Sequence, residues 1–65
     1  MRFWIECTRF ETGQATHINI ALVGSMWRDG ARTVLAFVGG HPERLEVVET
    51  LEQIMALHLG PLAKV

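Results

Sequence analysis

Residues 50–61 read TLEQIMALHLGP and decide how the chain ends. Thr50 and Gln53 stand at the spacing of a capping box, in which each side chain binds the backbone N–H group of the other residue. Leucine, isoleucine and methionine then recur at intervals of three and four residues, which is the period of one helix face. A glycine and a proline follow, and they favour a C-terminal cap and prevent continuation. The sequence therefore predicts a helix over residues 51–59.

Upstream of this helix, the chain alternates between β-type segments and turn signals. Ile, Val, Thr, Phe and Trp are frequent between the turns, as they are in pleated strands. The pair Asp29-Gly30 separates two apolar runs and is a strong hairpin signal, because primed turns need a positive φ. The expected strands cover residues 2–10, 16–27, 31–38 and 44–48, and the second has candidate breaks at Asn19 and Gly24.

Short loops between these strands favour antiparallel pairing of neighbours. The predicted fold class is therefore α+β, with a three- to four-stranded antiparallel meander followed by one C-terminal α-helix. The chain has 65 residues, so residues 1–65 are expected to form a single domain.

A domain this small buries only about 60% of its unfolded surface and usually needs additional stabilisation. Cys7 is the only cysteine, so an internal disulfide is excluded. The histidines His17, His41 and His58 do not stand at metal-ligand spacing, and we expect no metal and no cofactor. Association with another chain remains as the expected source of stability.

The overall charge is close to balanced. A formal net charge of −1 gives no field that attracts nucleic acid or anionic lipid. Charged residues soon follow the first apolar residues, unlike in a signal peptide, and no apolar run approaches the roughly 20 residues of a membrane span. We therefore expect a cytoplasmic protein with no membrane partner.

Alternation along the strands makes both faces of the predicted sheet apolar, whereas one short helix covers only one face. The surplus face is expected to be an interaction surface, because large exposed apolar patches mark such sites and Trp is frequent in them. Its candidate residues are Trp4, Phe10, Trp27 and Phe37. We expect this face to be buried in a homodimer; the alternative is that the sheet curls and buries its own second face.

The chain resembles the FlbD-like group of very small bacterial proteins, which are found with flagellar genes. The matching positions are Gly13, Ile18-Asn19, the segment TVLAFVGG at residues 33–40 and the segment VVETLEQI at residues 47–54. The resemblance covers nearly the full length. It implies a small adaptor-like role without a chemical reaction.

The residues that could perform chemistry all have a structural interpretation. Cys7 lies mid-strand among apolar residues and is expected to be a buried structural cysteine. The histidines are expected to be structural, and the segment GGHP at residues 39–42 is expected to be a turn that Pro42 rigidifies. Four glutamates are expected to form a solvated rim; they are Glu43, Glu46, Glu49 and Glu52.

The function expected from the sequence is a non-enzymatic protein–protein interaction module or adaptor that self-associates. The alternative is a small nucleic-acid-binding protein that uses the hairpin at residues 27–32, where Arg28 and Arg32 flank the turn beside Trp27. Basic and aromatic side chains together bind single strands by phosphate contact and stacking. The arginines are few, since only Arg2, Arg9 and Arg44 lie outside this hairpin, and Asp29 partly offsets them.

Overall fold

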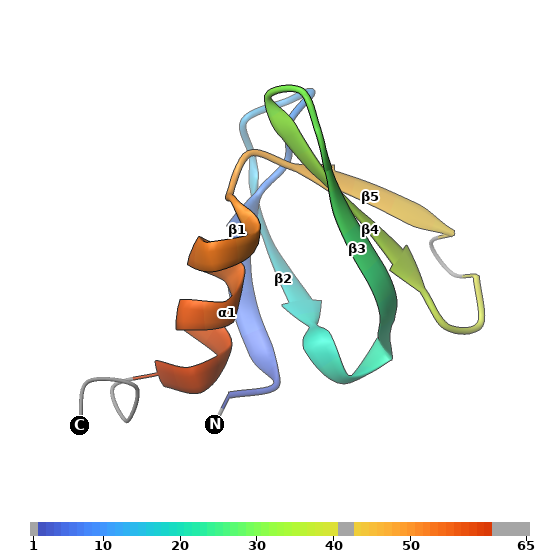
Figure 1. The fold of residues 1–65 in the computed structure, drawn as a ribbon, viewed down its shortest axis with the longest axis vertical. Helices are drawn as coiled ribbons and strands as arrows, with labels where there is room; N and C mark the ends of the chain where they lie inside the picture. Colours follow the sequence, from blue (N-terminus) through green and yellow to red (C-terminus); the bar gives the residue numbers. More distant parts are fainter. Residues whose placement is uncertain (1, 41–42, 61–65) are drawn as a thin grey trace.

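The computed structural model describes residues 2–40 and 43–60 and confirms an α+β fold of antiparallel strands with one C-terminal helix (Figure 1). The elements are β1 (Trp4–Thr8), β2 (Ala15–Asn19), a single 3₁₀ turn η1 (Ile20–Leu22), β3 (Val23–Asp29), β4 (Arg32–Phe37), β5 (Arg44–Val47) and α1 (Leu51–Leu59). The five strands form two sheets, β1–β2 and β3–β4–β5, rather than one meander of three or four strands.

The additional strand arises because the predicted second strand is divided at Asn19, one of its two candidate breaks. The Asn19 side-chain oxygen accepts a 3.1 Å hydrogen bond from the backbone N–H of Ala21. A short polar side chain that binds the backbone two residues later stabilises a turn in place of a ladder. The turn redirects the chain, so that β2 pairs with β1 and β3 pairs with β4.

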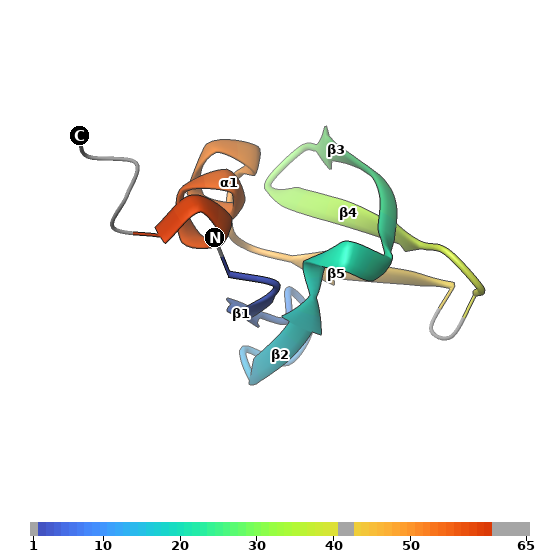
Figure 2. The ribbon, with the colours of Figure 1, turned by 90° about the horizontal axis from the view of Figure 1, so that it is seen from below.

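The two sheets are joined where the end of β1 meets the end of β5. Arg9 and Val47 form an isolated antiparallel bridge. The N–H of Phe10 donates to the Glu46 carbonyl at 3.0 Å, and the N–H of Val48 donates to the Thr8 carbonyl at 3.0 Å. The strands therefore follow a curved path in the spatial order β2, β1, β5, β4, β3, with α1 across the open side between β1 and β3 (Figure 2).

One apolar core lies inside this curve and takes residues from both sheets and the helix. Its buried members are Ile5, Cys7, Ile18, Leu35, Leu45, Val47 and Ile54. The strand residues alternate with exposed or half-buried neighbours in β1 and β5, as the two-residue period of a strand requires. The inner faces of the two sheets thus cover each other. The curled arrangement buries one face of each sheet and leaves the other face outside the core.

The predicted helix is confirmed with the same bounds. Thr50 Oγ1 accepts from the N–H of Gln53 at 3.1 Å, and Gln53 Oε1 accepts from the N–H of Thr50 at 2.8 Å, which completes the capping box. Ile54 is fully buried and fixes the helix on the core. At the other end, the N–H of Arg2 donates to the His58 carbonyl at 2.6 Å, so the helix is also attached to the chain just before β1.

Candidate interaction surface

The structure places the four predicted surface residues in three different regions. Phe10 and Trp27 lie on the outer face of the β3–β4–β5 sheet. Trp4 lies on the outer face of β1–β2 and is 64% exposed. Phe37 lies on the inner face of β4 and packs against the core. Only Phe10 and Trp27 therefore share a surface of the β3–β4–β5 sheet.

This surface, which we call the outer face, is built by strand register. Trp27 of β3 stands opposite Val34 of β4, and Val34 stands opposite Glu46 of β5. Phe10 follows on the other side of β5, since its N–H binds the Glu46 carbonyl. Val34 is only 4% exposed, whereas Trp27 and Phe10 remain 38% and 39% exposed. The outer face is therefore a row of two partly exposed aromatic rings around a buried valine.

Each aromatic ring of the outer face is accompanied by an arginine. The guanidinium carbon of Arg44 lies 5.4 Å from the centre of the Trp27 ring. That of Arg32 lies 5.6 Å from the centre of the Phe10 ring. A cation within about 6 Å of a ring face is attracted by the ring quadrupole. These contacts hold both rings and both cations on the surface of the sheet.

Arg32 is balanced by two carboxylates. Its guanidinium group binds Glu46 Oε1 at 3.1 Å and Asp29 Oδ2 at 3.3 Å. Exposed ion pairs of this kind contribute little to stability. Together, the two pairs hold the Arg32 side chain between Asp29 and Glu46. The outer face thus has charges of both signs close together.

Arg28, the other arginine of the predicted hairpin, points to the opposite face. Its Nη1 donates to Thr33 Oγ1 at 2.9 Å and to the carbonyl oxygens of Glu49 and Val48 at 3.3 and 3.4 Å. It therefore holds the segment between β5 and α1. The two arginines of the hairpin lie on different faces, because residues 28 and 32 differ in their pleat position.

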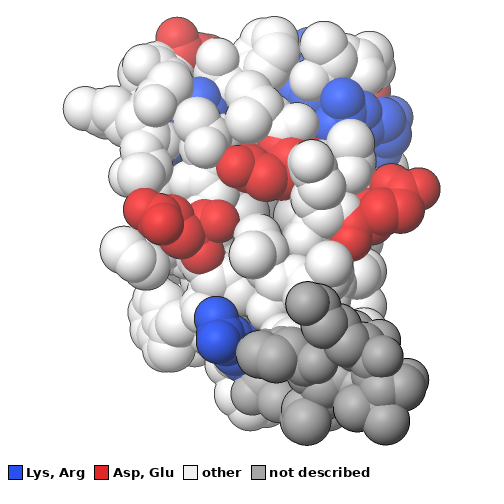
Figure 3. Space-filling model, turned by 90° about the vertical axis from the view of Figure 1, so that its left-hand side faces the viewer, with Lys and Arg blue, Asp and Glu red and all other residues white. Residues whose placement is uncertain are grey.

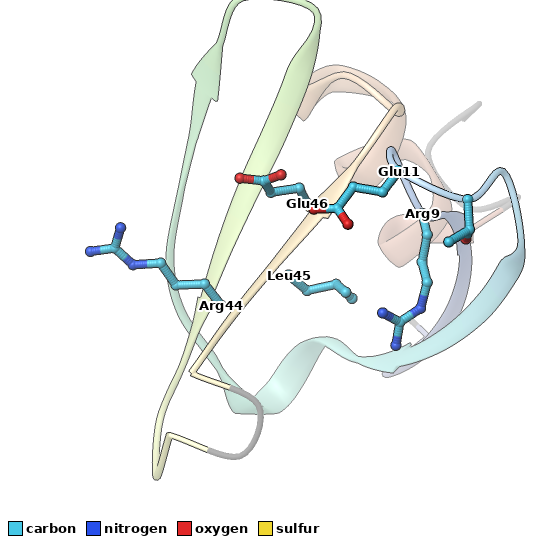
Figure 4. Close-up of a pocket in the computed structure, with 6 residues that line it drawn as sticks. Arg9, Glu11, Arg44, Leu45 and Glu46 are labelled. Carbon is cyan, nitrogen blue, oxygen red and sulfur yellow. The ribbon is translucent and has the colours of Figure 1, made fainter.

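A shallow hollow of about 290 Å³ lies beside β5, at the side of the outer face (Figure 4). Arg9, Glu11, Thr12, Arg44, Leu45 and Glu46 line it. Figure 4 shows that Arg9 and Arg44 extend in different directions, with Leu45 between them. Their guanidinium groups do not converge on one point, so they do not form a double-arginine anion site.

A second exposed region lies around Trp4, which is 64% exposed. Trp4, Arg2, Ile5, Glu6, His17 and Leu57 line a hollow of about 270 Å³ between β1, β2 and the helix. Figure 3 shows the left-hand side of the view in Figure 1, where acidic and basic groups are scattered over a mostly uncharged surface. This hollow has a mixed lining of apolar and polar side chains and lacks the two-arginine arrangement of the outer face.

The predicted structural role of Cys7 is supported by its burial, since it is 1% exposed. Burial raises the pKa of its thiol to about 12, with further contributions from the negative charges of Glu49 and Glu6. A thiol with this pKa stays protonated at neutral pH, and the protonated form is a poor nucleophile.

Only some of the glutamates that were predicted to form a solvated rim are exposed. Glu43 and Glu52 are exposed, as predicted, but Glu46 and Glu49 are half-buried and have partners. Glu46 binds Arg32, and Glu49 Oε1 accepts from the N–H of Thr8 at 2.8 Å. The prediction was wrong for these two residues, because their partners come from distant strands.

The histidines have separate surroundings. His17 is exposed on β2. His58 Nδ1 donates to the Arg2 carbonyl at 2.7 Å, and its ring lies 6.0 Å from that of Phe3. His41 and the proline of the predicted turn lie outside the described residues. Among the residues described, no three His, Cys, Asp or Glu side chains are grouped so that they could bind a metal ion.

Sequence reasoning missed Arg44 as a member of the surface. Its contact with Trp27 depends on β5 pairing with β4, and no local pattern around Arg44 indicates that pairing. Within residues 2–40 and 43–60, no helix has both the length and the apolar character that a membrane crossing requires. Comparison with protein-family models, curated proteins and solved structures gives no match to this chain, so the resemblance to the FlbD-like proteins stays a prediction.

Proposed function

We propose that this protein is a non-enzymatic interaction module that works as a homodimer and docks onto another protein. The observation that supports the proposal is the amount of apolar side chain left outside the core. The large hydrophobic residues that remain more than a third exposed are Phe3, Trp4, Phe10, Leu22, Trp27, Val38, Val48, Met55, Leu57 and Leu59. Removing such surface from water on association is favourable, in proportion to the area buried.

The residues that could perform chemistry fit this proposal better than an enzymatic one. Cys7 is buried and its pKa is raised, so its thiolate is not available as a nucleophile. Arg9 and Arg44 extend apart, so they cannot hold one anionic substrate between them (Figure 4). Catalysis needs groups that converge on a reacting atom.

The outer face favours a protein partner over nucleic acid. Binding to a phosphate backbone depends on basic side chains that neutralise phosphates. Arg32 is already bound by Asp29 and Glu46, and Arg28 is bound to backbone carbonyls on the opposite face. A surface with both signs of charge around aromatic rings is suited to another protein surface of the same mixed character.

Sedimentation equilibrium across a wide dilution series tests self-association. We expect a mass twice that of the 7.3 kDa chain, with dissociation on dilution as mass action requires. A constant monomer mass at every concentration would remove the homodimer from the proposal. A gel-shift assay at low salt with mixed single-stranded oligonucleotides tests the alternative, and we expect no shift.

Adaptor function is then tested by capture. The chain, immobilised through its C-terminus, is offered to the bacterial cytoplasmic proteins that the sequence resemblance suggests. Trp4→Ala is the variant that changes the exposed region around Trp4. We expect the wild type to retain one protein and Trp4→Ala to lose it, because Trp4 is exposed and available to a partner. Equal retention by both would contradict a role for that region.

A further inference from the structure

We infer that two copies associate through β3, which pairs antiparallel with β3 of the second copy around Trp27 and forms one continuous six-stranded sheet. This inference rests on the self-association proposed above and identifies the surface that performs it. In the described part of the chain β3 has one neighbouring strand, β4, so its other edge has no strand partner. An open edge presents unpaired N–H and C=O groups that can template another strand.

The hairpin turn determines which backbone groups face the open edge. Gly30 and Ala31 form a two-residue loop, because Asp29 pairs with Arg32. In such a loop the flanking pair exchanges both hydrogen bonds, and the bonded and non-bonded pairs then alternate along the ladder. Trp27 therefore bonds to β4, whereas the backbone groups of Met26 and Arg28 point to the open edge.

A twofold pairing centred on Trp27 uses these groups. Met26 then stands opposite Arg28 of the second copy, and Arg28 stands opposite Met26, so all the open N–H and C=O groups of these residues find partners. Beyond this stretch the register of β3 shifts between Val23 and Ser25. Such a bulge disrupts the ladder, which limits the new pairing to residues 25–29.

The same register brings the two Trp27 side chains together. They occupy a pair without hydrogen bonds, where opposite side chains are closest. Trp27 is 38% exposed, so ring surface remains to be covered. Paired aromatic rings on one sheet face stabilise a ladder beyond the area that they bury.

The charges of the outer face are complementary in this register. Ser25 of β3 stands opposite Ala36 of β4, and Ala36 stands opposite Arg44 of β5, so the three residues form one row across the sheet. Asp29 of the second copy stands opposite Ser25 and so enters that row. Both ion pairs of the described residues belong to Arg32, and Arg44 lies over the Trp27 ring. Arg44 therefore meets the carboxylate of Asp29 from the second copy at the Trp27 pair.

Among the residues that the structure describes, β2 also lacks a second strand partner, but its outer side chains are less suited to association. They are Ala15, His17 and Asn19, which provide no large apolar surface. On the β3 side, Met55 and Leu59 form an exposed apolar flank of α1, turned away from Leu57 and from β1 by helical spacing. A second copy along β3 places its own helix on the same side of the extended sheet, next to this flank.

Cysteine cross-linking tests the register. Ser25→Cys and Asp29→Cys are made separately, and the two proteins are unfolded together, refolded and oxidised mildly. We expect a disulfide between the two variants, because their positions are directly opposite in the proposed pair. Each variant alone is the matched control and is expected to stay uncross-linked, since residues 25 and 25 of the two copies lie about 13 Å apart along the strands. Both proteins keep Cys7, so a reductant is present during unfolding and is removed only after refolding has buried this residue again.

The proposed register is overturned if either variant cross-links with itself. It is also overturned if the refolded mixture contains dimers but no disulfide forms between the two variants. A second test substitutes each exposed tryptophan by lysine and measures mass by sedimentation and folding by circular dichroism. Trp27→Lys sets two like charges opposite each other and is expected to halve the mass of a folded protein, while Trp4→Lys remains a dimer. If wild type and Trp27→Lys are both dimers, the β3 inference fails and self-association stands. If the wild type is a monomer, the proposed self-association itself fails.

Discussion

Thr33 donates a 2.6 Å hydrogen bond from its buried hydroxyl to the carbonyl oxygen of Glu49, the residue that precedes the helix cap. The same hydroxyl accepts from Arg28 Nη1 at 2.9 Å. One side chain of the central strand β4 thereby joins the edge strand β3 to the start of α1. Together with the hydrogen bonds from Arg28 Nη1 to the Val48 and Glu49 carbonyls, these bonds connect the three-stranded sheet to the start of the helix.

Thr33→Val is expected to lower the free energy of unfolding by about 1–3 kcal/mol, because it removes both hydrogen bonds of a buried hydroxyl while the side chain keeps its shape. Urea unfolding monitored by tryptophan fluorescence measures the change. Thr16→Val is the matched control on half-buried β2, and we expect it to change stability much less. Equal losses in the two variants would show that the hydrogen bonds of Thr33 are not responsible.

Stability is expected to fall as the pH rises above the ordinary thiol pKa of 9.0. The pKa of Cys7 is about 12 in the folded protein, so between these values the unfolded chain loses the proton while the folded chain keeps it. The unfolded state then binds fewer protons, and stability decreases with pH. Thermal unfolding of wild type and Cys7→Ala across this range measures the effect. A slope that persists unchanged in Cys7→Ala would assign it to other groups.

Native Cys7 is expected to react very slowly with a thiol reagent at pH 8, because it is buried and protonated. Reaction in denaturant is expected to be fast, and the ratio of the two rates is the measurement. Fast modification of the native protein would mean that the core around Cys7 opens readily.

Thr50→Ala is expected to cost about 0.5–2 kcal/mol, since it removes the oxygen that accepts from the N–H of Gln53. The measurement is the midpoint of chemical unfolding. Thr50→Ser keeps the oxygen and is expected to retain most of the stability. If serine is no better than alanine, the capping hydrogen bond is not the cause of the loss.

Gly30→Ala is expected to destabilise the hairpin by about 1–2 kcal/mol, because Gly30 has a φ of +63° and a Cβ is unfavourable there. A Cβ at Gly30 would meet no atom within 4 Å, so the cost is one of backbone conformation. Gly24→Ala is the contrasting variant. It lacks the positive φ, and its Cβ would lie 3.2 Å from Cγ2 of the exposed Val38, which can move. We expect a smaller loss there, and the reverse order would contradict this explanation.

Local signals in the sequence predicted the elements that depend on neighbouring residues. The capping box at Thr50 and the period after it define the helix, and Gly30 defines the hairpin. Asn19 was one of two candidate breaks, and the structure shows that its side chain binds a backbone group only two residues away. These interactions are formed within one turn of chain and are visible in the order of residues.

The candidate surface depends on pairings between distant segments, which no local pattern specifies. The bridge between Arg9 and Val47 joins the two sheets, and it decides that Phe10 lies near Arg32. Phe37 alternates with Ala36 as a strand residue, but alternation does not tell which face the core occupies. Alternation along the strands predicted surplus apolar surface, while the division of that surface into separate regions required the fold.

The position of Ile54 affects how the chain folds during synthesis. Ile54 is completely enclosed by residues from both sheets, and the helix that contains it is also bonded to Arg2 near the beginning of the chain. While the last helix is still inside the ribosomal tunnel, the strands already outside have no partner for this part of their apolar surface. The native core therefore forms only after the helix has emerged, and nascent β1 and β2 are exposed to chaperones until then.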